Sequence, residues 1–276
     1  MIIWLASYPK SGNTWVRLFL NCLLFSEKKL ADINDIKIEQ FPNRKHFKNI
    51  TNNVDNFNEF VKNCTNAQYL LNLNKNIKFF KTHNTFWTSG KNSFSNEENT
   101  LGTIYIVRDP RNVITSIKNH YNKQNYEEAL KFIKNEKKIL ISENSKKKEY
   151  DLPTPISSWG NHYRSWKKMK KNYLLIKYES LLNSPNSEFN KIVNYIEKHT
   201  TFKFNDKEVN MAIDSCGFKN FKKQESINGF IESPKNTKNK FFYLGPDNNW
   251  ENLLNSKVKQ EIEMNFENEM KELNYL

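Results

Sequence analysis

The sequence predicts an α/β fold in which a mainly parallel central sheet is flanked by helices. Short apolar patterns typical of buried strands alternate with patterns of helical spacing along the 276 residues. The first strand pattern runs into a glycine-containing loop and then into a helix. Twenty Phe, twelve Tyr and 37% hydrophobic residues are enough for a sizeable core and argue against disorder. Because no internal repeat or linker is visible, we expect a single domain over residues 1–276.

The strands and helices follow from local patterns. Apolar runs rich in β-branched and aromatic residues predict strands over residues 2–7, 77–80, 103–107 and 173–178. A helix is expected from Thr14 onward, and Pro110 suits the first turn of another that continues to about Tyr121. The other expected helices are one carrying Val54, Phe57, Val61 and Cys64, a charged one over 123–150, one over 156–171, one carrying Phe189 to Ile196, and a last one with Val258, Ile262, Phe266 and Met270 at i+4 steps.

Charge and cysteine content narrow the function classes. The formal net charge of +13 indicates an anionic partner or substrate. Cys22, Cys64 and Cys216 lack the spacing of metal ligands, and their odd number fits reduced thiols. No apolar run approaches the roughly 18–20 residues of a membrane span, and the N-terminus lacks the features of a signal peptide. We therefore expect a cytoplasmic location.

The segment Tyr8-Pro-Lys-Ser-Gly-Asn-Thr-Trp15 lies between the first strand and the first helix. Such a loop gathers backbone N–H donors at the positive end of a helix dipole. Lys10 adds a mobile positive charge, and Ser11 and Thr14 add hydroxyl donors, which favours phosphate binding. The loop is not a Walker A motif, because Lys10 precedes Gly12. The alternative is an ordinary strand-to-helix turn with a capping hydroxyl.

Two further segments follow strands, at the sheet edge where α/β proteins bind ligands. Lys81-Thr82-His83 ends the second strand, and a histidine suits proton abstraction from a hydroxyl, although a lone histidine is more often structural. Arg108 follows the third strand and offers a bidentate fork to a phosphate, with Ser116 two helical turns further on. The alternative for Arg108 is a structural ion pair with Asp109 or Asp151. His46, His120, His162 and His199 have no such context and are interpreted as structural.

Together these segments resemble the sulfotransferases that use 3′-phosphoadenosine 5′-phosphosulfate (PAPS). Tyr8–Trp15 is similar to their 5′-phosphosulfate loop, Arg108–Ser116 to their 3′-phosphate segment, and Lys81-Thr82-His83 to their catalytic triplet. Ser158-Trp159, His162 and Ser165-Trp166 resemble a further helix motif, and Ile176–Glu179 the strand whose Tyr faces the adenine. The resemblance implies a P-loop-like fold and the following donor-site residues: Lys10, Ser11, Gly12, Asn13, Thr14, Trp15, Arg108, Ser116, Tyr178, Phe218 and Gly245.

The resemblance also implies a mechanism without a metal ion. His83 takes the proton of the acceptor hydroxyl or amine, Lys10 stabilises the leaving oxygen, and Lys81 helps to neutralise the transferring group. Ser116 holds Lys10 off the donor until the acceptor arrives. The acceptor is expected to be a small molecule or saccharide, and the lysine-rich stretch over about residues 122–155 favours an anionic one.

The sequence departs from the family pattern in its C-terminal element. Gly245 and Trp250 are kept, but the Arg-Lys pair that clasps the 3′-phosphate is replaced by Tyr243-Leu244. Lys235, Lys238 or Lys240 are candidate substitutes. Phe218 keeps its place, although Cys216-Gly217 precede it where the family has Thr-Ser. These departures leave open a related fold that binds nucleotide without turnover.

Two other function classes remain as alternatives. A P-loop kinase would be expected to carry the Walker A lysine, which is missing. A basic nucleic-acid-binding protein would account for the charge, but the lysines are scattered among Asn and Glu, and no nucleic-acid-binding motif is visible. We therefore expect no nucleic-acid partner and no metal, and the sequence does not indicate an oligomeric state.

Overall fold

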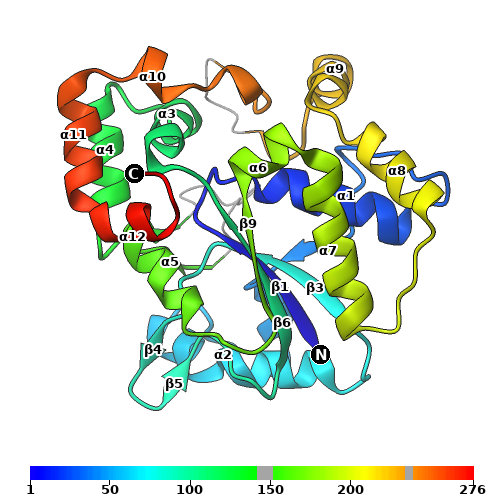
Figure 1. Cartoon of the computed structure of the whole chain (residues 1–276). Helices are drawn as coiled ribbons and strands as arrows, with labels where there is room; N and C mark the ends of the chain where they lie inside the picture. Colours follow the sequence, from blue (N-terminus) through cyan, green and yellow to red (C-terminus); the bar gives the residue numbers. More distant parts are fainter. Residues whose placement is uncertain (142–151, 234–238) are drawn as a thin grey trace. The chain divides into compact units, whose positions relative to one another are not determined.

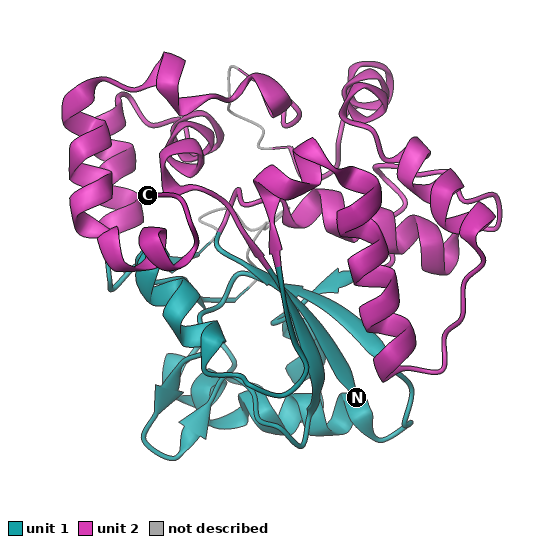
Figure 2. Cartoon of the chain, viewed as in Figure 1, with its two compact units in different colours: residues 1–8, 38–105, 135–175 teal, residues 9–37, 106–134, 176–276 magenta. Residues whose placement is uncertain are grey.

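The computed structural model describes residues 1–141, 152–233 and 239–276, and the chain forms two compact units (Figure 2). Unit 1 comprises residues 1–8, 38–105 and 135–175. Unit 2 comprises residues 9–37, 106–134 and 176–276. Each unit is therefore assembled from three separate stretches of chain. The expectation of one domain over residues 1–276 stays a prediction.

Unit 1 is built on a sheet with the strand order β2-β3-β1-β6-β9 (Figure 1). The strands are β1 (Ile2–Ser7), β2 (Glu39–Gln40), β3 (Lys78–Thr82), β6 (Thr100–Val107) and β9 (Tyr173–Lys177), and the last two residues of β6 and of β9 belong to unit 2. Strand β3 pairs in parallel with both β1 and β2. Every residue of β1 is buried, as is usual for a parallel strand covered on both faces. The α/β fold class with a central parallel sheet is thus confirmed.

An aromatic core lies beside this sheet. The Trp4 ring centroid is 5.2 Å from that of Phe94, which is 5.8 Å from that of Trp166. Both indoles are satisfied, because Trp4 Nε1 donates to Thr100 Oγ1 and Trp166 Nε1 donates to the Asn84 carbonyl. The remaining elements of the unit are α2 (Phe57–Asn72), α5 (Trp159–Lys167), the 3₁₀ turn η1 (Arg44–Phe47), and the hairpins β4 (Thr88–Ser89) with β5 (Asn92–Ser93) and β7 (Ile139–Leu140) with β8 (Thr154–Pro155).

Unit 2 is mainly helical. Its helices are α1 (Asn13–Phe25), α3 (Pro110–His120), α4 (Tyr126–Lys134), α6 (Tyr178–Asn183), α7 (Pro185–His199), α8 (Asp206–Ser215), α9 (Phe218–Asn228), α10 (Trp250–Leu253), α11 (Ser256–Asn265) and α12 (Glu267–Glu272), with the 3₁₀ turn η2 (Gly245–Asp247). Helix α3 begins as the sequence predicts, because the Asp109 carboxylate accepts from the Arg111 N–H and Pro110 occupies the first turn.

Several predicted boundaries are wrong. Helix α4 ends at Lys134 instead of spanning 123–150, and residues 142–151 of that prediction lie outside the described residues. The last predicted helix is interrupted at Phe266 into α11 and α12. Strand β9 ends at Lys177, so that Tyr178 opens helix α6. Helices α6, α8 and α9 are absent from the prediction.

Candidate active site

The predicted site residues fall into two groups, one in each unit. Unit 1 contains Lys81 and His83. Unit 2 contains the predicted donor-site residues, which are Lys10–Trp15, Arg108, Ser116, Tyr178, Phe218 and Gly245.

The loop before α1 has an unusual backbone. Lys10 has φ 67° and Gly12 has φ 102°, both in the left-handed region. Gly12 precedes the first residue of α1, Asn13, and the N–H groups of Trp15 and Val16 bond to the Gly12 carbonyl. Alternating right- and left-handed residues at a helix N-terminus turn successive N–H groups toward a common point, which is how proteins bind anions.

Two side chains of this loop carry buried polar atoms without partners. Ser11 is fully buried, and neither its Oγ nor Trp15 Nε1 has a hydrogen-bond partner within the described part of the chain. Leaving such groups unsatisfied in the folded protein costs free energy. A bound ligand with acceptor oxygens would satisfy them. Thr14 lies in the same first turn of α1.

Tyr178 forms a wall against the loop. A Cβ atom built on Gly12 would lie 2.5 Å from Tyr178 Cδ2, so the ring rests directly on the glycine. The Arg108 guanidinium lies 4.1 Å from the centroid of the Tyr178 ring, and Trp15 meets that ring edge-on at 6.0 Å. The side chain that was predicted to face the adenine therefore also supports the loop and Arg108.

Replacing Gly12 with alanine tests this close approach. We expect the free energy of unfolding to fall by about 2–4 kcal/mol, because overpacking against Tyr178 adds to the strain of a positive φ. The matched control is Gly229→Ala, since Gly229 has φ 68° but open space around it. Urea titrations that give equal losses for the two variants would contradict the role of Tyr178.

Arg108 and Ser116 are brought together as predicted. Arg108 Nη1 donates to the Lys10 carbonyl and to Ser116 Oγ, each at 3.3 Å. Ser116 Oγ also accepts from Asn248 Nδ2 at 3.1 Å, and that amide donates to the Asn112 carbonyl at 2.9 Å. Arg108 Nε is buried and has no hydrogen-bond partner in the described ranges. The guanidinium is therefore held in place with a donor to spare, as a phosphate site requires.

Of the two alternative partners of Arg108, Asp109 pairs with a different arginine. Asp109 binds Arg111, with Arg111 Nη2 at 2.6 Å from Asp109 Oδ2, and Asp151 lies outside the described residues. Arg111 also donates to Glu263 Oε1 at 2.6 Å and to the Tyr275 carbonyl at 2.7 Å. This buried network links the start of α3 to the C-terminal helices of unit 2.

The Phe218 ring rests on Gly245 in the same way as the Tyr178 ring rests on Gly12. Gly245 has φ 55°, and a Cβ atom there would lie 2.3 Å from Phe218 Cζ.

The positions of the Arg-Lys pair that the family pattern has and this sequence lacks carry Tyr243, which is 43% exposed, and Leu244. Of the candidate substitutes, Lys240 donates to Ser226 Oγ at 3.0 Å. Lys235 and Lys238 fall outside the described residues.

The side chain of Lys10 contacts a residue that the sequence analysis passed over. Its Nζ donates to His120 Nδ1 at 3.2 Å and lies 3.9 Å from the centroid of the Phe241 ring. His120 was interpreted as structural. Its position four residues after Ser116 on the same helix, and so on the same helix face, is a signal that could have identified it.

In unit 1, His83 follows strand β3 and is 5% exposed. Its Nδ1 lies 2.7 Å from the Ser7 carbonyl, and because a carbonyl only accepts, Nδ1 carries the proton. When the ring is neutral, its lone pair is therefore on Nε2, which is the nitrogen that can take up a proton. Lys81, in β3, is also 5% exposed and faces Leu5 across the ladder.

His162 positions the backbone of His83. It accepts from the Tyr105 hydroxyl at 2.8 Å through Nδ1, and its Nε2 donates to the His83 carbonyl at 3.1 Å. Complete burial lowers the pKa of His162 to about 3, so the ring is neutral at physiological pH and keeps this donor–acceptor pattern.

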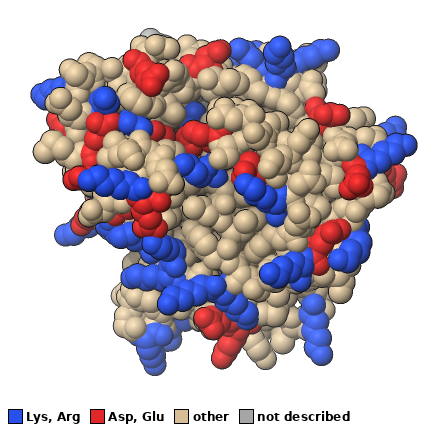
Figure 3. All heavy atoms as spheres, in the orientation of Figure 1, with Lys and Arg blue, Asp and Glu red and all other residues tan. Residues whose placement is uncertain are grey.

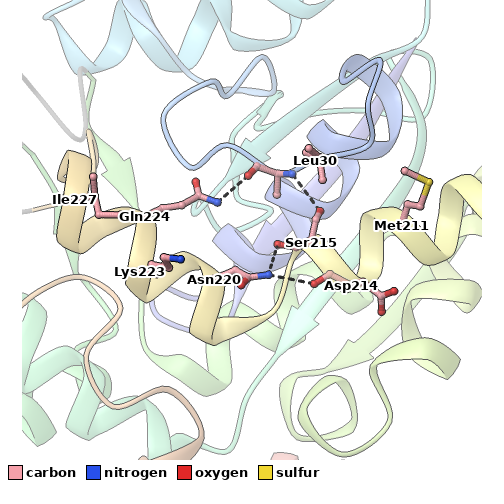
Figure 4. A pocket seen from close by; sticks show the side chains of 9 residues that line it. Leu30, Met211, Asp214, Ser215, Asn220, Lys223, Gln224 and Ile227 are labelled. Carbon is pink, nitrogen blue, oxygen red and sulfur yellow. Dashed lines mark hydrogen bonds between the residues drawn. The ribbon is translucent and has the colours of Figure 1, made fainter.

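A separate pocket of about 630 Å³ lies between α8, α9 and the chain that follows α1 (Figure 4). None of the predicted site residues lines it. Its polar groups already satisfy one another: Gln224 Nε2 donates to the Ala31 carbonyl, the Ala31 N–H donates to Ser215 Oγ, and Asn220 Nδ2 donates to the Asp214 carbonyl. The pocket is therefore not part of the candidate site.

The described ranges contain neither a candidate metal cluster nor a candidate membrane span. No cluster of three or more His, Cys, Asp or Glu side chains suited to a metal ion occurs among those residues. No helix in the same part of the chain has the length and apolar character needed to cross a membrane.

Known proteins are similar to this chain over nearly its whole length. Sulfotransferase 1B1 of Canis lupus familiaris is 24% identical over 280 residues, which cover 96% of this chain and 82% of that protein. The amine sulfotransferase of Oryctolagus cuniculus is 22% identical, with 98% and 81% covered. The solved structure of mouse sulfotransferase SULT7A1 complexed with PAP has a TM-score of 0.60 and 20% identity, over 98% of this chain and 84% of that one. The family model described as the sulfotransferase domain matches residues 2–274. This chain therefore belongs to the sulfotransferase family of enzymes.

Proposed function

We propose that this enzyme transfers a sulfuryl group from PAPS to a hydroxyl or amine of a small molecule or saccharide. The products are the sulfated acceptor and adenosine 3′,5′-bisphosphate (PAP). The observation that carries the proposal is the set of buried donors without partners within the described ranges, Ser11 Oγ and Arg108 Nε, beside a loop with left-handed backbone at the start of α1. An anion with two phosphate groups matches such a set.

The residues of unit 2 fit this ligand. Lys10 to Trp15 would hold the 5′-phosphosulfate, and Arg108 with Ser116 the 3′-phosphate. Tyr178 and Phe218 present aromatic rings for the adenine, next to Gly12 and Gly245 respectively. PAP in the mouse relative supports this choice of donor. Loss of the Arg-Lys pair leaves Arg108 as the proposed cation for the 3′-phosphate.

Bound PAPS supplies the sulfuryl group that the acceptor attacks, so the protein needs to move one proton and neutralise charge. We assign the proton to His83 Nε2, whose lone pair is fixed by the bond from Nδ1 to Ser7. Lys10 follows Ser7 by three residues and supplies positive charge to the leaving oxygen, and Lys81 supplies charge to the transferring group. The role of Ser116 in holding Lys10 stays a prediction, because the contacts described for Ser116 are those with Arg108 and Asn248.

The name of one relative supports the acceptor class that we propose. The rabbit relative is named for amines, which supports nitrogen as well as oxygen acceptors.

Basic side chains are frequent on the surface, but acidic ones are interspersed with them on the face in Figure 3. An uninterrupted basic surface of the kind that binds nucleic acid is therefore not seen on that face. The cytoplasmic location also remains a proposal.

Calorimetry with purified protein tests the donor site. PAP should bind in the absence of metal ions and more tightly than 5′-AMP or ATP, because only PAP has phosphates at both the 3′ and the 5′ positions. Equal affinity for the three nucleotides would contradict the donor assignment and favour nucleotide binding without sulfuryl transfer. Binding of ATP that requires Mg²⁺ would favour the kinase alternative.

Arg108→Ala should weaken PAP about tenfold or more, because charge-assisted bonds to the 3′-phosphate are lost, while 5′-AMP binding changes little. The informative quantity is the ratio of the two affinities. Arg44→Ala is the matched control, since Arg44 binds Asp55 on the surface of unit 1. A mutant that kept its preference for PAP over 5′-AMP would place the 3′-phosphate elsewhere.

A further inference from the structure

The contact between Lys10 and His120 goes beyond the proposed donor site. Lys10 lies in the loop before α1, and His120 is the last residue of α3 and 8% exposed. Their nitrogens are 3.2 Å apart, and the Phe241 ring lies against both: Lys10 Nζ is 3.9 Å from its centroid, and the His120 ring meets it edge-on at 5.8 Å. Three segments distant in sequence therefore converge on one ammonium group.

The chemistry of the pair fixes its protonation state. A lysine ammonium has three donors and no acceptor, so His120 Nδ1 must offer a lone pair. The imidazole is therefore neutral, with its proton on Nε2. The face of the Phe241 ring attracts the same ammonium through its quadrupole. A long and otherwise mobile side chain is thereby held in one place by two groups.

The backbone of Phe241 is held by hydrogen bonds to a buried carboxylate. The buried carboxylate of Glu225, on α9, accepts from the N–H groups of Phe241 at 2.7 Å and of Phe242 at 2.9 Å. It also accepts from Ser233 Oγ at 2.8 Å. The ring over Lys10 thus belongs to a fixed stretch of backbone.

We propose that His120 is a positioning residue that orders Lys10 for the 5′-phosphate of the nucleotide. The inference rests on the proposed function, because it takes Lys10 as a donor to that phosphate. With His120 in place, the lysine is ordered before the ligand arrives. Without it, binding must order the side chain and affinity falls.

Calorimetry with PAP on His120→Leu is the test. We expect the dissociation constant to rise about two- to tenfold, the cost of immobilising one side chain with many rotamers. Adenosine 3′-monophosphate, which lacks the 5′-phosphate, should bind wild type and variant equally. His120→Asn keeps an acceptor near the position of Nδ1 and should recover most of the PAP affinity, which a merely structural role would not predict.

A double-mutant cycle shows whether His120 acts through Lys10. In Lys10→Met, the further change His120→Leu should have no additional effect on PAP binding. PAP affinity that is unchanged or tighter in His120→Leu, an equal loss for adenosine 3′-monophosphate, or the same loss in the Lys10→Met background would overturn the inference. Failure of wild type to bind PAP would instead overturn the proposed function, so the two failures are distinguishable.

Discussion

His83→Ala is expected to lower kcat about a hundredfold or more while PAP still binds, which is the scale of losing a general base. The physical reason for this loss is the tautomer of the His83 ring. The Ser7 carbonyl fixes the proton on Nδ1, so a neutral ring has its lone pair on Nε2, the nitrogen to which we assign the acceptor proton. The measurement is the steady-state rate of PAP formation with the best acceptor from a panel of phenols, steroids and amines, together with the affinity for PAP.

His199→Ala is the control and should leave kcat unchanged, because His199 is the last residue of α7, lies beside the Tyr195 ring and is not assigned to the site. If PAP affinity fell in His83→Ala as much as turnover did, His83 would be structural and the base would be another group. His83→Gln gives a second comparison, since it retains a hydrogen-bonding side chain without a basic nitrogen.

Arg111→Met should produce the largest loss of stability, about 3–5 kcal/mol, because it leaves the buried Asp109 carboxylate without its cation. Arg111 is 6% exposed and donates to Asp109, to Glu263 and to the Tyr275 carbonyl. Its guanidinium also lies 4.0 Å from the centroid of a Trp250 ring. The measurement is the urea midpoint of unfolding, followed by circular dichroism.

Arg44→Met is the matched control. The Arg44 guanidinium makes a bidentate contact with the Asp55 carboxylate. Both side chains are exposed, that of Arg44 to 40% and that of Asp55 to 75%. Surface ion pairs contribute at most about 1 kcal/mol, so this variant should unfold close to wild type. Similar midpoints for Arg44→Met and Arg111→Met would mean that burial does not set the strength of the Arg111 network.

The sequence predicted structure best where an element depends on residues that are neighbours in the chain. The strand over 2–7, the loop before α1 and the start of α3 at Pro110 each follow from a few neighbouring residues. The prediction was wrong where tertiary contacts decide. Tyr178 has the β propensity of a strand residue, yet it opens α6 and packs its ring on Gly12.

The candidate site was also only partly predictable. Arg108 and Ser116 were paired correctly, because Arg108 immediately precedes the N-cap residue of α3 and Ser116 lies about two turns along that helix. The contact of Lys10 with His120 joins residues 110 positions apart, and Asn248 reaches Ser116 across 132 positions. The helical spacing from Ser116 could have drawn attention to His120, but no pattern within either segment encodes its contact with Lys10, which only the folded chain reveals.

The two glycines under aromatic rings have a consequence for how this sequence can evolve. Shrinking the ring of Tyr178 or Phe218 would open space for a Cβ atom, but the positive φ of Gly12 and Gly245 would remain. As far as packing is concerned, the dependence within each pair is therefore one-sided: the ring can become smaller without forcing a change of the glycine, whereas the glycine cannot acquire a side chain without strain. Selection for a stable fold alone would therefore keep both glycines, while the two rings would be kept by selection for the proposed nucleotide binding.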